Sequence, residues 1–177
     1  ARISLEEQLH CRTVPLLNLT SYNYLGMLYR PEVIEAAKRA LDRYGLGAAG
    51  SPILSGTMDI HVELEEAVAK FKGKEAAMVF PTGYSTNVGM ISGLMRPGDW
   101  IIADQNSHAS IVDGAILSKA NVRFFRHNNV ADLEKKLRQT NGKKLVAIEG
   151  IYSMDGDVCP LPDIVDTCER HGAILMV

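Results

Sequence analysis

The sequence lacks several features that would define a function directly. No stretch approaches the roughly 18 to 20 consecutive apolar residues that a membrane-spanning helix needs. The 19 Lys and Arg nearly balance the 21 Asp and Glu, and the net charge of −2 gives no sign of a nucleic-acid partner. Residues 1–10 do not have the charged-then-apolar pattern of a signal peptide. We expect no membrane span, no nucleic-acid partner and a cytoplasmic location.

Motifs for metals and for common nucleotide or hydrolase chemistry are also missing. The three cysteines (Cys11, Cys159 and Cys168) form no C-x-x-C, and the five histidines form no H-x-x-x-H pair. We therefore expect no metal, and free thiols in a reducing compartment. No G-x-G-x-x-G follows the first predicted strand, and neither a Walker A sequence nor G-x-S-x-G is found.

What is present is the composition of an α/β domain with a core of its own. The 177 residues are 46% hydrophobic and 23% charged, as in ordinary globular proteins. Pro31 begins a helix that Gly45 ends, and a second amphipathic helix covers residues 60–71. Apolar runs then predict strands at 76–80, 100–104, 122–126, 144–149 and 173–177, with helices between them, among them 130–140 and 161–171. This alternation indicates a mostly parallel sheet with helices on both faces, a three-layer α/β fold.

Polar residues follow several of these strands, and Ser107 is expected to cap the helix after the strand 100–104. In an open parallel sheet the ligand lies at the carboxyl ends of the strands. That rule gathers Thr82-Gly83-Tyr84, His108, Glu149 and Ser153 into one candidate site. Thr82-Gly83 also joins the strand 76–80 to a helix, where free backbone N–H groups and the helix dipole favour an anion such as a cofactor phosphate.

The ordered set of motifs resembles the α-oxoamine synthase family from about Leu19 to Val177. The motifs are Tyr24-Leu25-Gly26, Ser55-Gly56-Thr57, Thr82-Gly83-Tyr84, Ser107-His108-Ala109-Ser110-Ile111, His127-Asn128-Asn129 and the run from Glu149 to Asp157. The resemblance implies fold-type I, as in aspartate aminotransferase, with pyridoxal 5′-phosphate (PLP) as cofactor. It implies condensation of serine, alanine or glycine with an acyl-CoA or acyl-carrier thioester, with loss of carbon dioxide.

The resemblance also implies roles for individual residues. Gly83 and Tyr84 would bind the cofactor phosphate through their backbone N–H groups, and Thr82 would add its hydroxyl. His108 would stack on the cofactor ring and contact the substrate carboxylate, so it is the predicted catalytic residue. Ser153 would lie near the 3′ oxygen of the cofactor, and Glu149 would orient its neighbours.

Other implications concern the organisation of the chain. Tyr22, Asn23 and Tyr24 would contact substrate, residues 1–30 would form an N-terminal arm, and residues 31–177 would begin the cofactor-binding domain. The Schiff-base lysine and the aspartate for the pyridine nitrogen would follow Val177, so we expect a fragment that is inactive alone. The loop 45–56 would reach a neighbouring subunit in a homodimer.

Several alternatives stay open at this point. The motifs are closest to the serine palmitoyltransferase branch of the family, while Pro52 and Asp155 leave the 8-amino-7-oxononanoate synthase and glycine C-acetyltransferase branches open. An aminotransferase of the same fold, a non-catalytic subunit of a heterodimeric synthase, and a plain α/β binding module are further alternatives. The retained His108 argues against a degenerate subunit.

Overall fold

A computed structural model describes residues 21–177, which divide into two compact units. The first unit ends at Val62, and the second comprises Glu63–Val177. The first contains the short 3-10 turn η1 (Met27–Tyr29), helix α2 (Pro31–Tyr44) and the π-helical turn η2 (Pro52–Gly56). Helix α3 (Asp59–Lys72) begins in the first unit and continues into the second. None of the helices in residues 21–177 is long and apolar enough to cross a membrane.

Helices α2 and α3 begin and end where their sequence signals predict. Proline stands at the start of α2, where its missing N–H is not needed. Gly45 ends that helix at φ 77°, and its N–H donates to the carbonyl of Leu41. Gly73 ends α3 at φ 61°, and the N–H of Lys74 donates to the carbonyl of Ala69, as in a Schellman motif. Both predicted helices are thereby confirmed.

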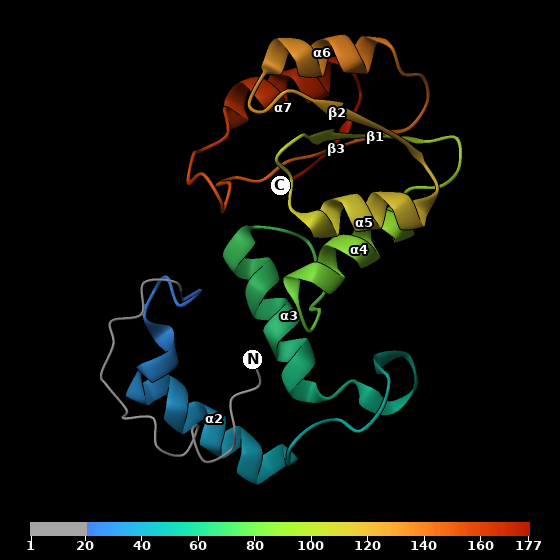
Figure 1. The fold of residues 1–177 in the computed structure, drawn as a ribbon. Coiled ribbons are helices and arrows are strands. Elements are labelled where there is room, and N and C mark those ends of the chain that lie inside the picture. Colours follow the sequence, from blue (N-terminus) through green and yellow to red (C-terminus); the bar gives the residue numbers. More distant parts are fainter. Residues whose placement is uncertain (1–20) are drawn as a thin grey trace, which may run out of the picture. The chain divides into compact units, whose positions relative to one another are not determined.

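The second unit is a four-stranded parallel sheet with helices on both faces (Figure 1). The strand order is β2-β1-β3-β4, and every pairing is parallel. Strands and helices alternate regularly along the chain, which confirms the predicted α/β fold. Their bounds are α4 (Gly83–Leu94), β1 (Trp100–Asp104), α5 (Ala109–Ser118), β2 (Asn121–Phe125), α6 (Val130–Arg138), β3 (Lys144–Ala147), α7 (Leu161–Arg170) and β4 (Ile174–Met176).

Side-chain alternation along β1 divides the core into two layers. Ile101 and Ala103 pack against α4 and α5, whereas Ile102 faces the opposite way, toward α6 and α7. Both clusters contain side chains that are almost fully buried, each worth about 1.5–3 kcal/mol of transfer free energy for a large aliphatic residue. The sheet is therefore covered on both faces, as its continuous apolar strands require.

The predicted strand 76–80 is wrong in this structure. These residues are irregular, and Met78 is 72% exposed. The N–H of Val79 donates to Oε1 of Glu65 rather than to a strand carbonyl. A strand needs an edge to pair with, and no strand in residues 21–177 pairs with this segment. Apolar content alone therefore predicted the wrong structure here.

A surface ion-pair cluster joins α6 to α7. Oε1 of Glu134 accepts hydrogen bonds from Arg170 (2.7 Å) and Arg138 (2.9 Å), and His171 lies 3.5 Å away. The guanidinium groups of Arg170 and Arg138 lower the pKa of Glu134 from 4.5 to about 2. Since folding lowers this pKa, the cluster stabilises the fold above pH 4.5, and that contribution is lost as the pH falls toward about 2.

We predict that Glu134→Gln lowers the free energy of unfolding at neutral pH, because the two arginines lose their carboxylate. The variant should also lose less stability than the wild type as the pH falls from 4.5 to about 2. Urea denaturation of the full-length protein across this pH range measures both effects. Glu169→Gln is the control, since Glu169 is an exposed carboxylate of α7 without an ion pair in the described part of the chain. Parallel pH profiles for the wild type and Glu134→Gln would contradict the prediction.

Candidate active site

The sheet has a topological switch point between β1 and β3. From β1 the chain passes through α5 to β2 on one side, and α6 then returns it to β3 on the other side. Equal handedness of these crossovers puts α5 on one face of the sheet and α6 and α7 on the other (Figure 1). The loops after β1 and β3 therefore diverge, which opens the crevice where ligands bind in this kind of sheet. His108 belongs to the first loop, and Glu149 and Ser153 belong to the second.

His108 is the N-cap of α5, in place of the predicted Ser107. Its ring Nδ1 accepts the backbone N–H of Ser110 at 3.1 Å, so the imidazole does what a serine hydroxyl does in most caps. Helix α5 consequently begins one residue later than a cap at Ser107 would predict. The Ser107 hydroxyl is buried and has no hydrogen-bond partner among the described residues.

A second contact orients the His108 ring through the neighbouring helix. Ser110, which is 1% exposed, places its Oγ 2.7 Å from Nδ1 of His108. The same Oγ accepts from Nδ2 of Asn87 in α4 at 2.9 Å. Since Asn87 donates, the serine hydrogen is free to go to Nδ1. We infer that the neutral ring carries its proton on Nε2, the nitrogen that no described residue holds.

The first turns of α4 and α5 lie side by side. The Asn87–Ser110 hydrogen bond joins them, and the Tyr84 hydroxyl donates to Asp113 in α5 at 2.6 Å. That hydrogen bond raises the pKa of Tyr84. Gly114 permits the close packing, because a Cβ there would lie 3.1 Å from both the Asn87 carbonyl oxygen and Cβ of Ile91. The packing brings the Thr82–Tyr84 turn and His108 to the same end of the two helices.

The N-terminus of α4 has the geometry of an anion site. Thr82 is the N-cap, and its Oγ1 accepts the N–H of Ser85 while the Ser85 hydroxyl accepts the N–H of Thr82. The N–H groups of Gly83 and Tyr84 are left, because the first turn of a helix offers them no acceptor. Within residues 21–177 no side chain accepts from them. A Cβ built on Gly83 meets nothing within 4 Å, so the approach is open.

The loop after β3 contributes two of the predicted residues. Oε1 of Glu149 accepts the backbone N–H of His108, which ties the end of β3 to the start of α5. Ser153 is exposed in the loop 150–158, directly after the buried Tyr152. The structure thus brings Glu149 into contact with His108 and places Ser153 on the loop beside the same crevice.

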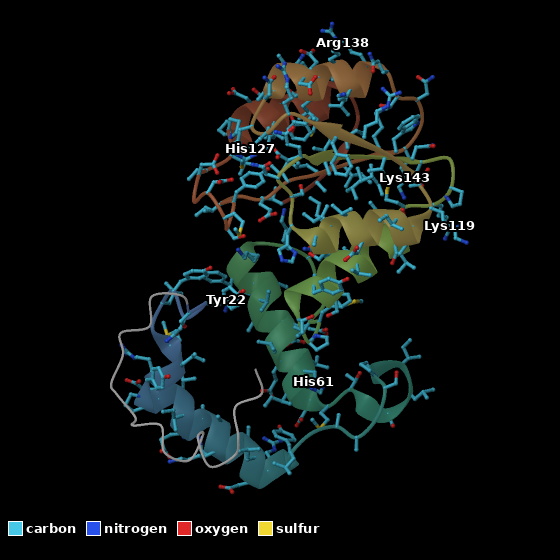
Figure 2. All side chains as sticks on the ribbon, in the orientation of Figure 1. Tyr22, His61, Lys119, His127, Arg138 and Lys143 are labelled. Atoms are coloured by element: carbon cyan, nitrogen blue, oxygen red, sulfur yellow. The ribbon has the colours of Figure 1, made fainter. Side chains whose placement is uncertain are left out.

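The sequence did not predict a charged network at this edge of the sheet. Asp104, fully buried at the end of β1, accepts from Nδ1 of His127 at 2.8 Å and from the N–H groups of Asn106 (2.8 Å) and Asn128 (2.9 Å). His127 lies at the end of the sheet from which the loop after β3 extends (Figure 2), and its Nε2 is 2.7 Å from Asp157. The sequence feature that could have indicated this network is the run His127-Asn128-Asn129, which was used only as one motif of the family resemblance.

The charges of this network follow from its contacts. The hydrogen bond to Asp104 raises the pKa of His127, and Asp157 acts in the same direction. The hydrogen bond from His127 in turn lowers the pKa of Asp157. Both ring nitrogens face carboxylates, so His127 cannot accept a proton from a nucleophile as a catalytic base would. Among the described residues, no group of three or more His, Cys, Asp or Glu side chains could hold a metal ion.

The predicted substrate contacts Tyr22, Asn23 and Tyr24 belong to the first unit. Asn23 organises a local turn, in which its Oδ1 accepts the N–H of Leu28 and its carbonyl accepts the N–H of Gly26. Tyr22 and Tyr24 are 88% and 82% exposed (Figure 2 labels Tyr22). The structure describes this turn within the first unit only.

The fold and these loops define the class of protein. The chain belongs to the family described as aminotransferase class I and II, whose sequence pattern matches residues 14–177. The parallel three-layer sheet and the predicted resemblance agree with this membership.

Comparisons with individual proteins point to one branch of that family. The chain is 46% identical over 165 residues to an 8-amino-7-oxononanoate synthase from Alkaliphilus metalliredigens, an alignment covering 92% of this chain and 42% of that protein. The serine palmitoyltransferase structure from Sphingomonas wittichii superposes with a TM-score of 0.86 at 49% identity, covering 88% of this chain and 39% of that one. The S. paucimobilis serine palmitoyltransferase with a bound PLP–myriocin aldimine gives 0.85 and 46%, with the same coverage. These relatives confirm the resemblance to α-oxoamine synthases. The chain spans about two fifths of their length.

We predict that Ser110→Ala destabilises the fold by about 1–3 kcal/mol, because Asn87 is left without its acceptor in a partly buried contact. A double-mutant cycle with Asn87→Ala, followed by urea denaturation, should give a coupling of about 0.5–3 kcal/mol. Ser92→Ala is the matched control, since the Ser92 hydroxyl only donates to the Val88 carbonyl within α4. Additive effects of the two single changes would contradict the proposed orientation of the His108 ring.

Proposed function

We propose that this chain forms the cofactor-binding part of a PLP-dependent enzyme that joins an amino acid to an acyl thioester, with loss of carbon dioxide. One observation carries the proposal. His108 is held at the switch point by contacts from α4, α5 and the loop after β3, and its Nε2 has no partner among the described residues; beside it is a helix N-terminus with two free N–H groups. The relatives named serine palmitoyltransferase and 8-amino-7-oxononanoate synthase support the same reaction class.

The residues at the start of α4 fit the cofactor phosphate. Two N–H donors, the positive end of the helix dipole and an open approach suit a dianion. The Thr82 hydroxyl accepts the N–H of Ser85 in the capping box, and its own hydrogen would turn to the phosphate from the Ser85 hydroxyl, which lies 2.9 Å away. We propose that Gly83 and Tyr84 bind the phosphate through the backbone, and that Thr82 adds a hydroxyl.

The residues at the switch point fit the other side of the cofactor. His108 would stack its ring on the pyridine and direct Nε2–H to the carboxylate of the amino acid. Glu149 would hold the backbone of His108 in place, and Ser153 would donate to the cofactor's 3′ oxygen. When bound, PLP supplies an electron sink that lets the Cα proton of the amino acid leave. The lysine and aspartate that this chemistry requires would follow Val177 in the whole protein.

The N-terminal part of the chain would serve the substrate and the partner subunit. We propose that residues 1–30 form an arm whose Tyr22, Asn23 and Tyr24 contact substrate, and that the cofactor-binding domain begins at residue 31. We also propose a homodimer in which the loop 45–56 reaches the other subunit. Its Gly56 has no room for a side chain, since a Cβ would lie 2.1 Å from the Gly50 carbonyl oxygen, and Leu54 on the same loop is 85% exposed. Sedimentation velocity on the full-length protein tests this, and an active monomer would contradict it.

We propose a substrate preference nearest that of serine palmitoyltransferase, on the basis of the motifs and the structural superposition. We also propose a location in the cytoplasm. The free, buried thiols of Cys159 and Cys168 are consistent with a reducing compartment. The sequence identity of this chain to the A. metalliredigens protein makes 8-amino-7-oxononanoate synthase activity the second candidate.

The full-length protein tests the reaction directly. With PLP it should show an absorbance band in the range of about 400–430 nm that shifts on addition of serine, alanine or glycine. Release of carbon dioxide and free thiol with a panel of long, short and carrier-bound acyl thioesters should then identify the substrates. Preference for serine with a long acyl-CoA would support the first candidate, and preference for alanine the second. Amino-group transfer to a keto acid, without thiol release, would overturn both.

We predict that Gly83→Pro weakens PLP binding by about tenfold to a hundredfold, because it deletes one N–H donor to a charged phosphate. Proline is tolerated at the first helical position, and Thr82 at φ −147° and ψ 155° has the extended backbone that a residue before proline requires. The fold should therefore be unaffected. Gly83→Ala keeps the N–H and is the control. Fluorescence titration with PLP measures the affinities, and equal affinity for the two variants would refute the phosphate site.

A further inference from the structure

One charged cluster near the proposed site has no role in the proposed reaction. Asp104, His127 and Asp157, which we call the His127 clasp, join the end of β1, the loop after β2 and the loop after β3. The His127 ring is largely enclosed, with 19% of its side chain exposed, and the two carboxylates stand at opposite nitrogens. The Tyr152 ring also packs against it in a T-shaped contact, with 4.4 Å between the ring centroids.

The clasp supplies the shortest side-chain hydrogen bonds that hold the loop 150–158, whose Tyr152 side chain is also buried in the core. Oδ2 of Asp157 accepts from His127 at 2.7 Å and from Nδ2 of Asn128 at 2.9 Å, whereas its Oδ1 has no partner among the described residues. Asp155 adds only a longer contact of 3.3 Å from Asn106. Within the loop, the N–H of Tyr152 donates to the Asp157 carbonyl, so the anchored residue also closes the turn that contains Ser153.

We propose that His127 is a positioning residue: as an imidazolium between Asp104 and Asp157, it holds the loop 150–158, and with it Ser153, against the carboxyl end of the sheet. The importance of Ser153 rests on the proposed function, but the clasp rests on its own contacts. The contacts of His127 all go to the sheet and its connecting loops. The order of the loop 150–158 should therefore follow the charge of the His127 ring.

The ring charge defines a pH window for the clasp. The titratable groups facing His127 are Asp104 from β1 and Asp157 and Tyr152 from the loop, and Nδ2 of Asn128 lies 3.2 Å from its Nε2. Folding raises the pKa of His127 above its ordinary 6.5, so the clasp is complete below pH 6.5 and is lost as the pH rises through the folded pKa. Folding lowers the pKa of Asp157 below 3.8, so protonation opens the clasp only in strong acid.

The neutral ring has one N–H left, and the burial of the partners decides where it goes. Asp104 is fully buried, and leaving it without the ring N–H would be costly. The Asp157 side chain is 42% exposed and can be hydrated instead. On deprotonation, therefore, Asp157 should lose its hydrogen bond from His127 and keep only the one from Asn128, so its loop should loosen while the Asp104–His127 hydrogen bond persists.

Hydrogen exchange in the full-length protein, followed by NMR, tests the clasp. The reporters are the amides of Tyr152, Gly156 and Cys159, which donate to Asp157, Tyr152 and Gly150 within the loop. Their protection factors should stay level from about pH 5 to the titration midpoint of His127, read from its ring nitrogens, and then fall about tenfold. The Ile148 amide, which donates to Met176 in the sheet, should stay protected and reports any global loosening.

Variants separate the clasp from general destabilisation. His127→Gln should lower the loop protection factors about tenfold at every pH, and Asp157→Asn should do so while also lowering the His127 midpoint by about 1 pH unit. Asp157→Asn keeps the buried Asp104–His127 pair, so it remains informative if His127→Gln does not fold. Asp155→Asn is the matched control in the same loop and should change neither quantity. Loop protection that ignores the His127 titration, or equals the wild type in both clasp variants, overturns the proposal.

The test is independent of the proposed reaction. Loop loosening in the clasp variants of a protein that binds no PLP would leave the clasp standing and refute the proposed function. Normal PLP binding with an unaltered loop in Asp157→Asn would refute the clasp alone.

Discussion

Parallel pairing of β1 with β2 on one side and β3 on the other is the interaction on which the rest of the second unit depends. Ile101 is in register with both Val122 and Leu145, so the three strands end at the same edge. Because the chain leaves β1 in one direction and returns to β3 in the other, the two following loops diverge to opposite faces. His108 and Glu149, 41 residues apart in the chain, come into contact there.

Side-chain hydrogen bonds then give each polar residue at this edge a definite role. His108 has one ring nitrogen engaged by Ser110 and the other without a partner in the described part of the chain, which suits contact with a ligand. His127 has both nitrogens engaged by carboxylates, which suits attachment of a loop. The same side chain thus has two uses, and its partners decide between them. Such buried networks define one geometry because a lost partner leaves a polar group unsatisfied in a low dielectric.

Much of the fold followed from local patterns. The start of α2 at Pro31 and its end at Gly45, the strand Trp100–Asp104 and the alternation of the later elements were all predicted from apolar spacing, proline and glycine. The exceptions have physical reasons. Residues 76–80 are apolar enough for a strand, but nothing in the described chain pairs with them. Ser107 is a good cap residue, but the ring of His108 reaches the free N–H one residue later.

The sequence by itself determined the α/β class, the family resemblance and the polar residues that follow each strand, because periodicity and turn chemistry are local properties. Only the tertiary structure decided which of those residues meet. It showed that Asn87 orients His108 through Ser110, that Glu149 holds the His108 backbone, and that Asp104 and Asp157 enclose His127. These contacts join separate strands and helices, so strand order and helix packing, and not sequence spacing, set their distances.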